Sequence, residues 1–180
     1  MSSKKILIVN FGGIGDILNT TAIACHHKTK DNSIEIDFLT KNKYEFLLKN
    51  NIYIDKVILS GAEFDSFGSE VVTRHFKEQM AFDQYSDVLF AAPYMSPLYD
   101  RTPRSTLLNI IYEETSGIKE WSCDFMPYVF LSKEEVQEAD NFLQKTLGKY
   151  KIMIEYEYFS NQSIIDIECI LSLCDKFNGK

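Results

Sequence analysis

The sequence predicts an α/β fold, a parallel sheet flanked by helices. Two observations predict it. Short β-branched apolar runs alternate with amphipathic stretches of helical period through the first half of the chain. The first apolar run, residues 6–9, leads into the glycine-rich turn 10–15 and then into a helical pattern. Because strands that alternate with helices pair in parallel through right-handed crossovers, this rhythm indicates one parallel sheet.

The elements of the first half follow from these patterns in chain order. Strands are expected at residues 5–10, 34–40, 57–59 and 87–92. Helices are expected at 14–27, 44–49 and 69–82, with loops at 60–68 and 93–103. The first strand is continuous and apolar, which is typical of a strand buried on both faces. The loop at 93–103 follows the carboxyl end of a strand, where ligand-binding loops of α/β sheets lie.

The second half continues with helices and short extended pieces. Helices are expected at residues 105–116, 133–147 and 166–177, and strands or extended pieces at 129–131 and 150–154. Gly117 is a typical helix stop. The helix at 133–147 is the best marked, because Ser132 and Glu135 match a capping box.

The last strand and helix follow a domain that is already closed. We therefore expect a first domain over residues 1–148 and the opening strand, loop and helix of a truncated second domain over 149–180. The whole chain has 180 residues, enough for one domain of ordinary size or slightly more.

Composition excludes several classes of protein. A hydrophobic content of 45% supports a real core, and a net charge of −7 argues against a nucleic-acid or anionic-membrane surface. The four cysteines have no framework spacing and no signal peptide is visible, so reduced thiols in a cytoplasmic protein are expected. No apolar run approaches the roughly 20 residues of a membrane-spanning helix.

The glycine turn does not match the common nucleotide-binding motifs. Gly13 and Gly15 fit a dinucleotide fingerprint, but Leu18 replaces its third glycine. No Gly-Lys-Ser/Thr follows, which argues against a P-loop. Metal sites are not indicated either, because Cys25, His26 and His27 are adjacent on a helix and point in different directions. Neither an Asp-x-Asp pair nor a serine-hydrolase elbow is present.

Several segments instead resemble one family. The chief one is Ile6-Leu7-Ile8-Val9-Asn10-Phe11-Gly12-Gly13-Ile14-Gly15-Asp16-Ile17-Leu18-Asn19-Thr20-Thr21-Ala22. The others are residues 35–39, 51–58, 104–117 and 130–135. In order and spacing they resemble the N-terminal half of glycosyltransferase family 9, the ADP-heptose:lipopolysaccharide heptosyltransferases. The resemblance covers roughly residues 4 to 150.

The resemblance implies a GT-B architecture, in which two Rossmann-like domains face a cleft. The first domain would hold the acceptor and the second the nucleotide-sugar. Such enzymes invert the anomeric carbon without a metal, and they need no cofactor because the nucleotide-sugar is a substrate. Asp16 occupies the position of the family's proposed general base. Most of the donor-side half would be missing, so this chain alone is expected to be inactive or weakly active.

The candidate site residues follow from the same comparison. Asp16 is the catalytic candidate, and the substrate-binding candidates are Gly12, Gly13, Gly15, Asn19, Arg101, Arg104, Ser160, Gln162 and Ser163. The two arginines could bind an anionic acceptor by forked hydrogen bonds, and the last three residues could approach the donor phosphates. Each candidate has a structural alternative. Asp16 could be an ordinary first-turn acid, the arginines solvated loop cations, and residues 159–163 a polar loop that caps a helix.

The expected partners are a nucleotide-sugar and a glycan or lipopolysaccharide-type acceptor, with no nucleic acid. A lipid-linked acceptor would bring peripheral contact with the inner membrane from the cytoplasmic side. The alternatives are a non-catalytic Rossmann-like module that binds a nucleotide or sugar, and a structural or regulatory partner. The sequence leaves the sugar, the nucleotide and the oligomeric state open.

Overall fold

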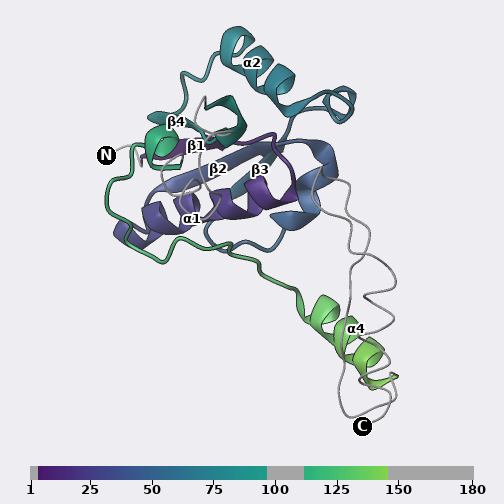
Figure 1. Ribbon diagram of the computed structural model, residues 1–180. Coiled ribbons are helices and arrows are strands. Elements are labelled where there is room, and N and C mark those ends of the chain that lie inside the picture. Colours follow the sequence, from purple (N-terminus) through teal and green to yellow (C-terminus); the bar gives the residue numbers. More distant parts are fainter. Residues whose placement is uncertain (1–3, 97–111, 146–180) are drawn as a thin grey trace, which may run out of the picture. The chain divides into compact units, whose positions relative to one another are not determined.

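A parallel four-stranded sheet is the centre of the fold (Figure 1). The computed structural model describes residues 4–96 and 112–145. The strands are β1 (Lys5–Val9), β2 (Glu35–Thr40), β3 (Lys56–Leu59) and β4 (Asp87–Phe90), in the order β3-β2-β1-β4. All the pairings are parallel, which confirms the predicted α/β class.

The inner position of β1 explains its sequence. It pairs with β2 through Ile6↔Ile36 to Val9↔Leu39, and with β4 through Ile6↔Asp87 to Val9↔Phe90. Its last four side chains are at most 1% exposed. A strand with neighbours on both edges and helices over both faces must be apolar at every position, and the run Ile-Leu-Ile-Val meets that requirement.

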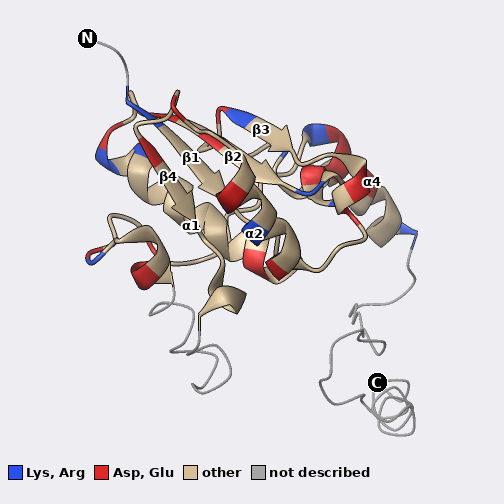
Figure 2. Ribbon diagram, turned by 90° about the horizontal axis from the view of Figure 1, so that it is seen from above, with Lys and Arg blue, Asp and Glu red and all other residues tan. Residues whose placement is uncertain are grey.

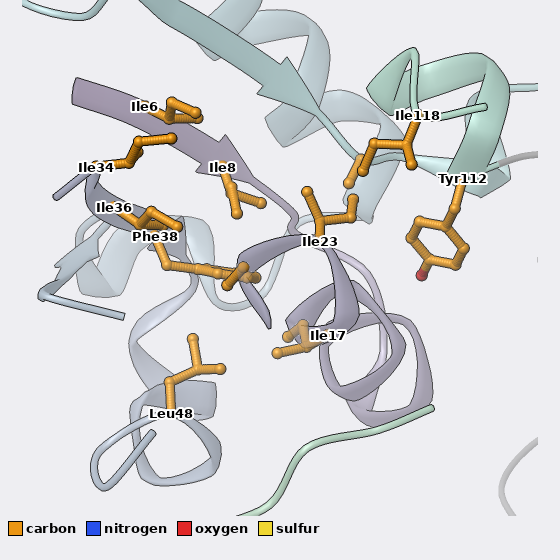
Figure 3. Packing of buried hydrophobic residues seen from close by; sticks show 12 residues of the cluster. Ile6, Ile8, Ile17, Ile23, Ile34, Ile36, Phe38, Leu48, Tyr112 and Ile118 are labelled. Carbon is orange, nitrogen blue, oxygen red and sulfur yellow. The ribbon is translucent and has the colours of Figure 1, made fainter. Parts of the chain in front are cut away.

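Two helices cover opposite faces of the sheet (Figure 1). α1 (Ile14–Lys30) buries Ile17 and Ile23 against Ile8 and other side chains of one face, the cluster that Figure 3 shows. α2 (Ser69–Gln79) packs Val72 and Phe76 against the other face. Alternate strand residues face opposite sides, so each strand contributes to both clusters.

Some predicted elements differ in the structure. The helix expected at 44–49 is a 3-10 helix, η1 (Asn42–Leu47), and two shorter 3-10 turns, η2 (Ala62–Phe64) and η3 (Pro93–Met95), lie in the predicted loops. The first turn of an α-helix is unfavourable to form, and segments this short add too few further hydrogen bonds to offset it. Short segments of this kind commonly form 3-10 helices instead. α1 extends to Lys30, beyond the predicted end at 27. Residues 129–131, expected as a short strand or an extended piece, are not part of the sheet.

A strap, defined as residues 118–130, runs back along α1. Residues 112–116 are helical and end at Gly117, whose φ of +68° and N–H bond to the Glu113 carbonyl confirm the predicted stop. The strap is pinned to α1 where the Ser122 N–H donates to His26 Nδ1 (3.0 Å) and the Tyr128 N–H to Thr21 Oγ1 (2.8 Å). The strap therefore packs along α1 and is fixed to it by these two hydrogen bonds.

Residues 133–180 separate from residues 1–132 as a second compact unit. Its described part is α4 (Lys133–Gln144), which confirms the predicted helix there, and its apolar residues Val136, Phe142 and Leu143 are exposed. The expected boundary at 148/149 and the strand and helix at 150–154 and 166–177 lie outside the described residues and stay predictions. So does most of the helix at 105–116.

Charges are mixed over the surface. Figure 2 shows basic positions interspersed with acidic ones on the described elements, not gathered on one of them. Within 4–96 and 112–145, no helix has the length and apolar character needed to cross a membrane.

Candidate active site at the carboxyl end of the sheet

The glycine turn between β1 and α1 places Asp16 at the carboxyl edge of the sheet. Gly13 is the N-cap of α1, and Asp16 is the third residue of the helix. Gly13 and Gly15 are exposed, and Ile14 is 51% exposed, so this helix mouth faces solvent. Asp16 itself is partly buried. A carboxylate is therefore presented where ligands of parallel α/β sheets bind.

The Asp16 carboxylate is held in place by the turn. Its Oδ2 accepts the Gly13 N–H at 3.0 Å. This donor and the positive end of the α1 dipole both favour the charged form of a carboxylate. The bond is also what an ordinary helix-starting acid would make, so the structural alternative for Asp16 is present in the geometry. The two roles are compatible.

Gly12 is the glycine that this arrangement requires. A Cβ at Gly12 would lie 2.6 Å from Asp16 Cβ and 2.9 Å from Asn10 Oδ1. A Cβ at Gly13 would be 3.8 Å from its nearest neighbour, and one at Gly15 would meet nothing within 4 Å. Gly12 thus lets the turn pass close to Asp16, whereas Gly13 and Gly15 leave open space at the helix mouth.

Three side chains donate hydrogen bonds to the backbone carbonyl of Asp16. We call them the carbonyl clamp, and they are Asn10, Thr20 and Tyr112. The Asp16 carbonyl accepts Thr20 Oγ1 at 2.7 Å, Tyr112 Oη at 2.8 Å and Asn10 Nδ2 at 3.2 Å. All three clamp residues are fully buried. The predicted site did not include the clamp, although the polar Asn10 directly after a buried apolar strand was a signal for it.

Tyr94 lies at the same edge, after β4. Its Oη accepts the Phe11 N–H at 3.3 Å and is 2.8 Å from Thr73 Oγ1, so it ties the glycine turn to α2. Burial raises the pKa of Tyr94 to about 12, and the nearby charge of Asp16 adds to the shift. Tyr94 therefore stays protonated and neutral at physiological pH. It belongs to the loop at 93–103 that was expected to face the ligand.

The other predicted site residues have separate outcomes. Asn19 is partly buried on α1, three positions after Asp16 and so on the same side of that helix. Arg101, Arg104, Ser160, Gln162 and Ser163 lie outside the described residues. Their predicted roles stay predictions.

Metal-ligating side chains do not gather in the described part of the chain. Over residues 4–96 and 112–145, no three His, Cys, Asp or Glu side chains come close enough to hold an ion. His26 and His27 of the adjacent Cys-His-His run are used differently. His26 Nδ1 accepts the Ser122 backbone N–H at 3.0 Å, burial lowers the pKa of His26, and burial lowers the pKa of His27 to about 4. Both rings are therefore neutral at pH 7.

A cavity of about 310 Å³ lies on the α2 face of the sheet. Its lining is mostly apolar and includes Leu39, Ile58, Phe64 and Phe76. No residue of the turn from Gly12 to Asp16 lines it. The cavity is therefore separate from the candidate site.

The fold and the candidate site together define a Rossmann-like α/β domain with a carboxylate at the carboxyl edge of its parallel sheet. Comparison with solved structures finds the same fold in a glycosyl transferase family 9 structure from Veillonella parvula DSM 2008. The two chains share 13% identity at a TM-score of 0.61, over 98% of this chain and 60% of that one. This chain therefore spans about three-fifths of that structure's length.

A second match is the E. coli heptosyltransferase WaaC with ADP-2-deoxy-2-fluoro heptose, at 12% identity and a TM-score of 0.43. It covers 67% of this chain and 50% of that one. No family model and no curated protein matches the sequence. The first match supports the α/β architecture of the parallel sheet and its helices.

Proposed function

We propose that this chain is the acceptor-side half of an inverting, metal-independent, heptosyltransferase-like glycosyltransferase. The observation that carries the proposal is the placement of Asp16, partly exposed at the carboxyl end of β1 and held on both its carboxylate and its carbonyl. The fold shared with the family 9 structure supports it. The activity is a proposal for the whole protein, because this chain spans 60% of that structure.

Asp16 would act as general base in this reaction. Its carboxylate would accept the proton of an acceptor hydroxyl as that oxygen forms a bond to the anomeric carbon of the sugar. The bond from that carbon to the nucleoside diphosphate breaks, and its electron pair leaves on the phosphate oxygen. Attack from the side opposite the leaving group inverts the anomeric carbon. The bond from Gly13 N–H to Oδ2 would orient the carboxylate for this step.

The substrates follow from the same proposal. The donor is a nucleotide-sugar, with heptose suggested by the resemblance to family 9, and no cofactor is required. The acceptor is a glycan of the lipopolysaccharide type, to which Arg101 and Arg104 would bind through anionic groups. Ser160, Gln162 and Ser163 would approach the donor phosphates. The reaction would take place in the cytoplasm, with peripheral contact at the inner membrane through a lipid-linked acceptor.

The test is transfer by the protein as its gene encodes it. The protein is incubated with a panel of nucleotide-sugars and of free and lipid-linked glycan acceptors, with and without EDTA. We expect release of nucleoside diphosphate that depends on the acceptor, persists in EDTA, and gives a product of inverted anomeric configuration by NMR. Retained configuration would contradict the mechanism, and the absence of transfer across the panel would contradict the function.

A non-catalytic binding module is the second candidate. The bond between Asp16 and Gly13 favours it, because this bond explains an acid at the position without any reaction. Calorimetric titration of the chain with free nucleotides, nucleotide-sugars and NAD separates the two. Tight binding without turnover favours the module. Weak binding of the donor by the chain alone agrees with the transferase proposal, in which a second, donor-side domain would bind the nucleotide-sugar.

A further inference from the structure

The Asp16 carbonyl is an unusually crowded acceptor. A carbonyl in the first turn of an α-helix ordinarily has one partner, the N–H four residues later. Here three side-chain donors converge on it, and they come from the residue after β1, from α1 and from the helical turn at 112–116. Such convergence immobilises the peptide group that follows the Asp16 Cα.

The donors themselves are fixed in orientation. Asn10 Oδ1 accepts the Gly12 N–H at 2.7 Å, so the amide nitrogen must face Thr20 and Asp16. Asn10 Nδ2 donates to Thr20 Oγ1 at 2.6 Å. The single Thr20 hydroxyl proton has two acceptors, Tyr112 Oη at 3.2 Å and the Asp16 carbonyl at 2.7 Å, and the shorter contact favours the carbonyl. A buried network in which each member has partners is rigid.

Of the three clamp residues, Tyr112 is the farthest from Asp16 in the sequence. It lies 96 positions from Asp16 in the sequence, and its ring packs on Phe125 at 5.4 Å. Phe125 contacts Trp121 at 4.8 Å, and Trp121 contacts His26 of α1 at 5.5 Å. Figure 3 shows Tyr112 beside α1, near Ile118. Tyr112 thus contacts the first turn of α1 at Asp16, and the strap contacts α1 near its C-terminus at His26.

We infer that Tyr112 is a positioning residue, which sets the place of the Asp16 carboxylate through the backbone of the first turn. The inference rests on the proposed function of Asp16 as a base. A base must lie within about 3 Å of the hydroxyl it deprotonates, and a misplacement of about 1 Å can cost roughly 100-fold in rate. Losing one of three donors leaves the turn folded but less sharply placed.

The test is Tyr112→Phe, which removes one hydroxyl and keeps the ring on Phe125. We expect kcat for transfer to fall at least about 10-fold with KM changed less than about 2-fold, because only the placement of the base is affected. The matched control is Tyr85→Phe, which removes the 2.7 Å bond from Tyr85 Oη to Asp37 on the other face of the sheet. The control should leave kcat unchanged.

Amide hydrogen exchange separates this inference from the proposed function. In Tyr112→Phe the Ile17 N–H, which bonds to the Gly13 carbonyl, should exchange several-fold faster, while the Ala24 N–H should not. If the wild-type protein shows no transfer, the proposed function fails, and faster exchange at Ile17 alone still supports the positioning role. A kcat equal to that of the wild type, or exchange raised equally along α1, would overturn the inference.

Discussion

Replacing Gly12 by alanine tests the close approach between the turn and Asp16. The new Cβ would lie 2.6 Å from both Asp16 Cβ and Oδ2, about 1 Å inside ordinary contact. Overpacking of this kind costs about 1–3 kcal/mol. Restricting the unfolded chain returns about 0.4–1 kcal/mol, because the backbone of Gly12 is not in the positive-φ region. We expect a net loss of about 1–2 kcal/mol in the free energy of unfolding.

Gly15→Ala is the matched control, three residues away. Its Cβ meets nothing within 4 Å, and Gly15 lies in the first turn of α1, where alanine is the better helix former. We expect this change to stabilise the protein by up to about 0.5–1 kcal/mol. The assay is urea unfolding followed by circular dichroism, with both variants compared to the wild type. Equal midpoints for the two variants, or a stable Gly12→Ala, would refute the packing described for the turn.

Two further predictions concern partly buried titratable groups. Burial lowers the pKa of His27 to about 4, below the unfolded value of about 6.5, so the unfolded chain binds the proton first as the pH falls. Stability in urea should therefore decrease between pH 6.5 and 4, and His27→Gln should flatten that decrease, whereas the exposed His75→Gln should not. Burial raises the pKa of Cys123 to about 12, so its alkylation by iodoacetamide at pH 8, followed by peptide mass mapping, should be far slower than in urea. Equal rates in the two conditions would contradict the buried setting of that thiol.

Local patterns predicted the sheet well. The four strands were expected from short β-branched runs, and each is found within the predicted range to within one or two residues. The hydrophobic period and the length of each apolar run predict a strand from local sequence. Contacts with residues far along the chain are not needed for that prediction. η1 was misread because Phe46 and its neighbours look like an apolar face, yet Phe46 is 63% exposed and the segment is too short for an α-helix.

The site was predictable only in part. Asp16 and the glycines could be proposed because they are contiguous in the sequence, and the structure adds that Gly12 is the tightly packed one. Tyr112 and Tyr94 were missed as site neighbours, because each reaches the turn only through the tertiary fold, from 96 positions beyond Asp16 and 83 beyond Phe11. A helical pattern predicts that a tyrosine is buried, but it does not predict which group its hydroxyl will form a hydrogen bond with.

Asp16→Asn tests the central claim most directly. The amide oxygen can still accept the Gly13 N–H, so the helix start is kept while the base is lost. Glu70→Gln, which changes a first-turn acid of α2, is the matched control. We expect the rate of transfer by Asp16→Asn to fall at least about 100-fold. Its free energy of unfolding should stay within about 1 kcal/mol of that of the wild type, and Glu70→Gln should remain active. Near-normal transfer by Asp16→Asn would contradict the assignment of the base.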